Sequence, residues 1–377
     1  MRFGTARPAH RGSVAPLFIV ALVTIGLLWP GASPTVHVQA PASFASRVAQ
    51  LSEPGGFFDT DNLISNERSY LHVIPALRAR GVTGGAYIGV GPDQNFSYIA
   101  QVRPTIAFII DIRRDNLLLH LLFKALFSMS QTRVDYLGLL FGRPVPANLE
   151  EWRQADLDKL IAYVEGAMPA DASTAALRRR VDATIRTFGV PLTAMEWATI
   201  DRFHRAFIDA GMPLKFESTG RAPRGYYPTY RELLVETDGQ GNRSNFLASE
   251  DGFQFVRSLE RRDLVIPLVG DLGGPSALAA IGKMMTARGD RLSTFYASNV
   301  EFYLFGDSKW ERFIDTLGRL PRNENSVLIR SVFGGYVLPQ SVPGYFSTSL
   351  IQPVDELMAK YARGQYQSYN DLMLLGR

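Results

Sequence analysis

The chain contains no cysteine and only five histidines among its 377 residues. The absence of cysteine excludes a disulfide framework, a thiol nucleophile and a cysteine-bound metal. No pair of histidines has the spacing of metal ligands, so we expect no zinc site. His120 lies in a nearly continuous apolar stretch, which predicts a histidine of the hydrophobic core rather than a ligand.

The net charge is also small. The formal net charge is +4, and 20% of the residues are charged. This small excess gives no reason to expect a nucleic-acid partner. The strand-to-helix turns described below lead us to expect a small-molecule ligand. The hydrophobic share of 46% is ordinary for a globular protein. The length suits one large α/β domain with an insertion, or two smaller domains.

Residues 1–40 have the pattern of a targeting segment. Three arginines precede an uncharged, mostly apolar run over 14–29, and a proline-rich tract then ends in small residues: Arg2, Arg7, Arg11 and Val38-Gln39-Ala40. The apolar run is long for a signal peptide and short for a membrane span, so both a cleaved signal peptide and a membrane anchor stay open. Either one places the rest of the chain outside the cytoplasm. A start codon assigned too early would leave the protein in the cytoplasm.

The segment from Gly84 to Asp111 predicts a nucleoside-binding βαβ unit. A short apolar strand ends at Gly89 and Gly91, where glycine lets the backbone turn tightly and approach a ligand. A helix start follows, and a second apolar strand then ends in Asp111. A carboxylate about 20 residues after the glycines lies where a ribose diol would bind.

The third glycine of a dinucleotide fingerprint is replaced by Gln94 in this chain. A pyrophosphate needs Gly or Ala at that position for close approach and packing. The loop therefore favours a nucleoside without a pyrophosphate, such as S-adenosyl-L-methionine, over NAD.

A second strand-to-helix turn follows the apolar run over 264–270. It contains an acid, two glycines and a proline, in the order Asp271-Leu272-Gly273-Gly274-Pro275. Ligands of open α/β sheets bind at the carboxyl ends of the strands, so we expect Asp271 at the same mouth as Gly89 and Asp111. A polar cluster over 59–67 is expected either to cap a helix or to fold over the glycine loop, with Asn66 and Glu67 touching the ligand.

These patterns predict an α/β, Rossmann-like, mostly parallel sheet with a large helical insertion after its second strand. We expect the Rossmann domain to occupy residues 45–340, with the insertion at 115–212 and a C-terminal tail at 341–377. The run over 326–332 is expected to be the last strand of the sheet.

Several long motifs resemble an uncharacterised bacterial protein family. They lie at residues 58–67, 87–96, 111–114, 246–250, 269–271 and 295–304. The resemblance implies a class I S-adenosyl-L-methionine-dependent methyltransferase-like fold, and it implies no particular methyl acceptor. The exported-looking leader departs from what a methyltransferase needs, because S-adenosyl-L-methionine is a cytoplasmic cofactor.

Three functions stay open at this point. In a methyltransferase, the cofactor would be bound by Asn66, Glu67, Gly89, Gly91, Gln94, Asn95, Asp111, Ile112, Arg113 and Asp271. Asp271, Glu67 and Asn299 would hold the acceptor, and at most one of them would need to act as a general base. An exported, non-catalytic protein of the same fold could instead bind another small molecule or a partner. An NAD-dependent oxidoreductase is the third alternative, which Asp111 permits and Gln94 argues against.

Overall fold

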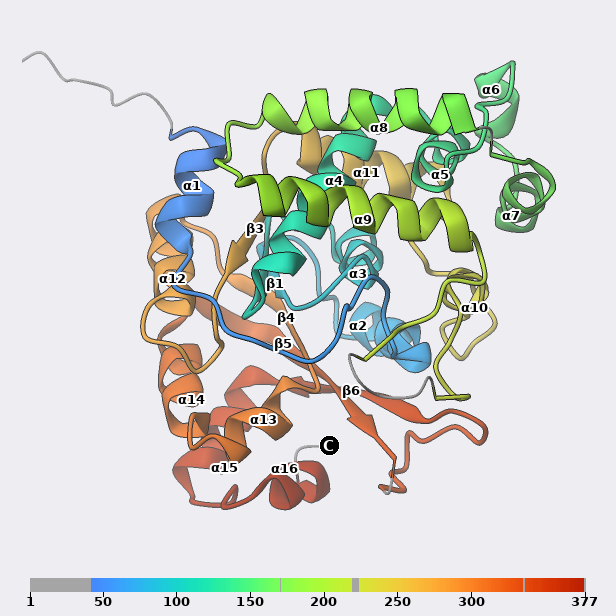
Figure 1. The fold of residues 1–377 in the computed structure, drawn as a ribbon. Helices are drawn as coiled ribbons and strands as arrows, with labels where there is room; N and C mark the ends of the chain where they lie inside the picture. The colour runs from blue at the N-terminus through green and yellow to red at the C-terminus, as the bar shows by residue number, and fades with distance from the viewer. Residues whose placement is uncertain (1–41, 170, 219–223, 335, 376–377) are drawn as a thin grey trace, which may run out of the picture. The chain divides into compact units, whose positions relative to one another are not determined.

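The computed structural model describes residues 42–169, 171–218, 224–334 and 336–375 (Figure 1). The expected leader at residues 1–40 lies outside these ranges. Within them, no helix combines the length and the apolar character that a membrane span requires.

A six-stranded sheet forms the centre of the fold, in the strand order β3-β2-β1-β4-β5-β6. Strands β1 to β5 are parallel, and β6 runs antiparallel to β5. This order is that of a doubly wound Rossmann-like sheet, in which the order of the strands reverses between β1 and β4. The strands are β1 (Ala86–Gly89), β2 (Ile106–Asp111), β3 (Val265–Val269), β4 (Leu292–Ser298), β5 (Arg322–Phe333) and β6 (Ser347–Pro353).

The helices cover the sheet and extend well beyond it (Figure 1). The N-terminal ones are α1 (Phe44–Leu51), the 3-10 helix η1 (Arg68–Val73), α2 (Ile74–Ala79) and α3 (Gln94–Val102). Those between β2 and β3 are α4 (Arg114–Met129), α5 (Arg133–Phe141), α6 (Leu149–Trp152), α7 (Leu157–Gly166), α8 (Asp171–Arg186), α9 (Ala194–Ala210), α10 (Tyr230–Val235) and α11 (Glu250–Arg261). The C-terminal ones are α12 (Ala277–Arg288), α13 (Val300–Gly306), α14 (Trp310–Arg319), α15 (Val354–Ala362) and α16 (Tyr369–Leu375).

Strands β1, β2 and β3 are buried on both faces because each is a short, almost uninterrupted apolar run. Ile88 of β1 is aligned with Phe108 of β2 on one side and Phe295 of β4 on the other. All three side chains are fully buried. The sheet is therefore a rigid base whose loops at the carboxyl ends can hold a site.

The segment between β2 and β3 is helical and contributes no strand to the sheet among its described residues. Helix α4 packs on β2 and β3, and α8, α9 and α11 pack in turn on α4. The expected insertion at 115–212 falls inside this segment. The helices continue to Arg261, so the strand-free segment is longer than the sequence pattern indicated.

The expectation that the strand over 326–332 is the last one is wrong. The segment 341–377, expected to be a mixed tail, contains β6, which pairs with β5 along its whole length. Its sequence, Ser-Thr-Ser-Leu-Ile-Gln-Pro, lacks a clear apolar pattern. Ser347 and Ser349 are nevertheless buried, because their hydroxyls bond Ser69 of η1 at 2.9 and 3.2 Å.

Candidate functional site

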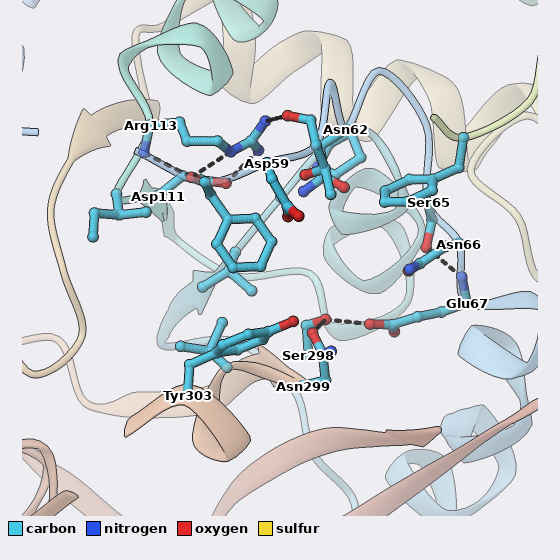
Figure 2. A pocket seen from close by; sticks show the side chains of 18 of the residues that line it. Asp59, Asn62, Ser65, Asn66, Glu67, Asp111, Arg113, Ser298, Asn299 and Tyr303 are labelled. Atoms are coloured by element: carbon cyan, nitrogen blue, oxygen red, sulfur yellow. Dashed lines mark hydrogen bonds and ion pairs between the residues drawn. The ribbon is translucent and has the colours of Figure 1, made fainter. Parts of the chain in front are cut away.

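A cavity of about 530 Å³ opens at the carboxyl ends of β1 to β4. This is the switch point of the sheet, where ligands bind in open α/β folds. The volume lies within the range of roughly 300–1,000 Å³ that is common for small-molecule sites. Figure 2 shows its walls: the segment containing Asp59 to Glu67, the end of β2 and the residues just after it with Asp111 and Arg113, and the end of β4 and the start of α13 with Ser298, Asn299 and Tyr303.

Most of the residues predicted for the site do line this cavity. They are Asn66, Glu67, Gly91, Gln94, Asp111, Ile112, Arg113, Asp271 and Asn299. The polar segment over 59–67 forms one wall, as one of the two interpretations of that cluster expected. Gly89 and Asn95 are the exceptions, because neither lines the cavity.

Asn95 stabilises the glycine loop without lining the cavity. Its side-chain amide donates to the carbonyls of Val90, Gly91 and Pro92 at 2.9, 3.2 and 2.7 Å. Its oxygen accepts from the Tyr87 hydroxyl at 2.7 Å. All its hydrogen-bonding capacity toward the loop is used inside the protein, so Asn95 shapes the loop and has no free group for a ligand.

Gly89 is required by packing rather than by a ligand. A Cβ atom at this position would clash with the Asn95 side chain and lie 2.7 Å from the Tyr87 ring. Gly91 has a different role: its φ of +82° lies in the left-handed region, and it lines the cavity. The two glycines therefore serve one turn in two distinct ways.

Asp111 ends β2 at the cavity, and its carboxylate is engaged by Arg113. The guanidinium bonds both carboxylate oxygens, at 3.2 Å from Nε and 2.8 Å from Nη2, and the Arg113 backbone N–H adds a third bond at 2.9 Å. Nη1 of Arg113 also bonds the carbonyls of Thr60 and Asp61, both at 3.1 Å. A carboxylate has about four acceptor positions, so Asp111 keeps little capacity for the two hydroxyls of a ribose.

Glu67 is a buried carboxyl at the floor of the cavity, 1% exposed. Its Oε2 accepts from the hydroxyls of Tyr296, at 2.5 Å, and Ser331, and its Oε1 accepts from Ser298. Burial raises the pKa of Glu67, and the three hydroxyl bonds lower it only in part. A carboxyl with a raised pKa in a cavity is a candidate to exchange a proton with a ligand.

Two cavity residues have a backbone conformation that side chains rarely adopt. Asn62 has a φ of +51° and Ser298 a φ of +53°. Asparagine tolerates the left-handed region, whereas serine is held there at a cost of about 1 kcal/mol or more. In Ser298 this conformation directs the hydroxyl to Glu67.

Asp271 lies at the cavity and pairs with Lys309, whose ammonium is 2.8 Å away. The turn that follows Asp271 binds the side chain of Glu53. The Glu53 carboxylate accepts four hydrogen bonds of 2.9 Å, from the backbone N–H groups of Asp271, Ser276 and Ala277 and from the Ser276 hydroxyl. Of the two glycines in this second turn, Gly274 lies against the Glu53 carboxylate, where a Cβ atom would clash with it, and Gly273 lies against Lys309 and Leu304.

Aromatic side chains around the cavity were not expected as site residues. Phe57, Tyr226, Tyr303 and Phe346 line it and are partly or largely exposed. Tyr226 stacks on Phe346 with ring centroids 3.6 Å apart, and Phe58 meets Tyr303 edge to face at 4.9 Å. Tyr303 lies in the aromatic stretch Phe302-Tyr303-Leu304-Phe305, which could have indicated it, whereas Tyr226 and Phe346 lie in irregular segments.

His120, expected in the core, is buried behind the glycine loop. Its Nε2 lies 2.9 Å from the carbonyl oxygen of Gly91. Burial lowers the pKa of His120 to about 4, so the ring is neutral at pH 7. It supports the loop and does not line the cavity.

The comparisons with known proteins identify a family but not an activity. Residues 63–374 match the family described as Domain of unknown function (DUF7790). No curated protein matches the chain. The matched range includes the whole sheet, α2 to α15 and most of the cavity. The chain therefore belongs to the DUF7790 family.

Proposed function

We propose that this protein binds S-adenosyl-L-methionine in the cavity and methylates a small-molecule acceptor. The position of the cavity supports a nucleoside ligand, because it lies between the glycine loop after β1 and the acidic end of β2. When bound, the cofactor would supply an activated methyl group on a positively charged sulfur.

The charge of the cavity is the observation that carries the proposal. Its lining contains five acids, Asp59, Glu67, Asp111, Asp271 and Asp307, and three basic residues, Arg113, Arg224 and Lys309. Arg113 pairs with Asp111, and Lys309 pairs with Asp271 and Asp307. An acidic cavity whose inner cations are already paired suits a cationic sulfonium ligand and disfavours the pyrophosphate of NAD.

In this proposal each wall has a defined task. Gly91, Ile112 and Arg113 border the nucleoside, and Gln94, Asn66 and Asp271 contribute polar contacts to the cofactor. Glu67 and Asn299 face the acceptor from the ends of η1 and β4. The main requirement of methyl transfer is the alignment of the acceptor with the methyl group. The rigid sheet would hold the residues that align them.

A calorimetric titration of the purified full-length protein with S-adenosylhomocysteine tests the proposal, with NAD as the control. We expect binding of the first compound and none of the second. A thermal shift gives an independent readout, because a ligand at a hundred times its Kd stabilises the fold by about 2.7 kcal/mol. A well-folded sample that binds neither compound would refute the proposal.

An exported, non-catalytic binding protein is the second candidate. The engagement of Asp111 by Arg113 favours it, because this contact competes with recognition of a ribose. Under this alternative, N-terminal sequencing of the secreted protein would find a mature end near Ala40, and the protein would not bind S-adenosylhomocysteine.

A further inference from the structure

Two residues that line the cavity, Gln94 and Glu67, each have a side-chain oxygen that lacks a donor it could bind. The side chain of Gln94 is 6% exposed, and its Oε1 is buried without a hydrogen-bond partner among the described residues. Its Nε2 lies 3.2 Å from the Tyr296 hydroxyl. Since the single proton of that hydroxyl is donated to Glu67, the Gln94 group facing Tyr296 must be the donor. The Gln94 oxygen is therefore left as an unused acceptor.

The second oxygen is Oε1 of Glu67. It accepts one hydrogen bond, from Ser298, whereas Oε2 accepts two. A carboxylate oxygen has about two acceptor positions, so Oε1 has room for one more donor. Glu67 and Gln94 are bridged by the same Tyr296 hydroxyl, and both line the cavity. They thus offer two acceptors to one ligand group.

No cation of the described segments pairs with Glu67, whose hydrogen-bond partners are three neutral hydroxyls. A buried carboxylate without a cation is costly, and a positively charged ligand group would remove that cost. A primary ammonium has three donors and no acceptor, so it matches a carboxylate and an amide oxygen placed together.

The outer part of the cavity is aromatic. Tyr226 and Phe346 are stacked, and Phe57 and Tyr303 also line it. Such rings bind flat apolar groups well, and they also attract cations over their faces. Figure 2 shows the Tyr303 side chain and the Glu67 carboxylate extending from opposite sides toward Ser298. A ligand with a charged end at Glu67 and an aromatic body would fill both parts.

We propose that the methyl acceptor is a small aromatic amine, bound with its ammonium group at Glu67 and Gln94 and its ring between the aromatic side chains of the cavity. That the amine is methylated rests on the proposed function. That the cavity binds an amine does not depend on the cofactor. Oε1 of Glu67 would then receive the proton that the ammonium must lose before its nitrogen can attack the methyl group. The new N–CH3 bond would form as the S–CH3 bond of the cofactor breaks, and S-adenosylhomocysteine would be the leaving group.

Calorimetric titration of the full-length protein with phenethylamine tests the proposal. Two compounds of the same shape serve as controls: 2-phenylethanol is neutral, and phenylacetate carries a negative charge. We expect phenethylamine to bind at least about ten-fold more tightly than 2-phenylethanol, because hydrogen bonds to a charged group are the stronger ones. Phenylacetate should not bind. Equal affinities for the amine and the alcohol would overturn the proposal.

Glu67→Gln should weaken phenethylamine binding by roughly ten- to a hundred-fold and leave 2-phenylethanol binding nearly unchanged. Glu324→Gln, at an exposed position of β5, is the matched control and should change neither. Because Glu67 is buried, its variant could fail to fold. Phe346→Ala changes a partly exposed side chain and should weaken both the amine and the alcohol by about ten-fold. Unchanged affinity in both Glu67→Gln and Phe346→Ala would refute the site.

The failures of the two proposals are distinguishable. If phenethylamine binds and S-adenosylhomocysteine does not, the amine site stands and the methyltransferase proposal fails. Binding of S-adenosylhomocysteine without binding of phenethylamine is expected if Glu67 and Gln94 hold the amino group of the cofactor. Glu67→Gln would then weaken S-adenosylhomocysteine but not 5′-methylthioadenosine, which lacks that group, and phenethylamine would not bind. That result would overturn the acceptor proposal.

Discussion

The guanidinium of Arg113 bonds both carboxylate oxygens of Asp111, two residues before it in the chain. The side chains of the pair are 7% and 10% exposed. Asp111 therefore stabilises the cavity wall through Arg113. It also lines the cavity, where it could contact a ligand. A variant of Asp111 alone cannot separate these two roles, since it leaves a buried guanidinium unpaired.

Asp111→Ala should lower the free energy of unfolding by about 3–5 kcal/mol, the usual cost of breaking a buried ion pair. Arg113→Met should release the carboxylate. If Asp111 binds the ribose of the cofactor, the Arg113 variant should keep or improve its affinity for S-adenosylhomocysteine. Chemical denaturation and calorimetry of both variants measure the two effects. Equal loss of binding in both would show that the intact pair is what the ligand needs.

Asn95→Ala should act on the loop and not on a ligand contact. It removes four hydrogen bonds, to Val90, Gly91, Pro92 and Tyr87, in a fully buried place. We expect a loss of about 2–4 kcal/mol in the free energy of unfolding, because several buried groups lose their partners. Asn95→Asp keeps the oxygen but not the donors and should be similarly unstable. A variant as stable as the parent would contradict this role.

Glu53→Gln should weaken the connection between the N-terminal segment and helix α12. The carboxylate accepts three of its four bonds at the N-terminal end of α12, where a negative charge is also favoured by the helix dipole, and the fourth from the backbone N–H of Asp271. We expect destabilisation of about 1–2 kcal/mol for Glu53→Gln and more for Glu53→Ala, measured by urea unfolding. High salt should reduce the difference between the parent and the Gln variant if the charge contributes.

Asp93 gives a prediction for the pH dependence of stability. It is buried, accepts from the Tyr230 hydroxyl at 2.6 Å, and burial raises its pKa from 3.8 to about 6. A carboxyl with a raised pKa favours the folded state while protonated. Its contribution is therefore complete below pH 3.8 and is lost as the pH rises to about 6. The shift corresponds to roughly 3 kcal/mol.

Asp93→Asn should remove this dependence. The difference in unfolding free energy between the variant and the parent should grow in favour of the variant from about pH 4 to pH 6 and stay constant above. His120, whose pKa burial lowers to about 4, acts in the opposite direction over part of this range. Only the difference between the two proteins therefore isolates Asp93. A pH-independent difference would contradict the assignment.

The sequence by itself determined the elements that local pattern controls. Continuous apolar runs marked β1, β2, β3 and most of β5, and glycines and acids marked the turns at the carboxyl ends of β1, β2 and β3. Because parallel strands bring those ends to one edge, most of the residues that line the cavity could be predicted. The match of residues 63–374 to a family of unknown function agrees with the resemblance to an uncharacterised family and says nothing of a methyltransferase. Apolar periodicity did not reveal β6, because its serines are buried through hydrogen bonds and not through apolar contact.

Only the tertiary structure decided what each of those residues does. Glu67 meets Tyr296 and Ser331 across separations of 229 and 264 residues, and Glu53 reaches α12 across more than 200. Asn95 and Gly89, which looked like ligand contacts, are used by the protein itself. The physical reason is that a hydrogen-bonding group serves either the fold or a ligand, and which one depends on neighbours that only the folded chain brings together.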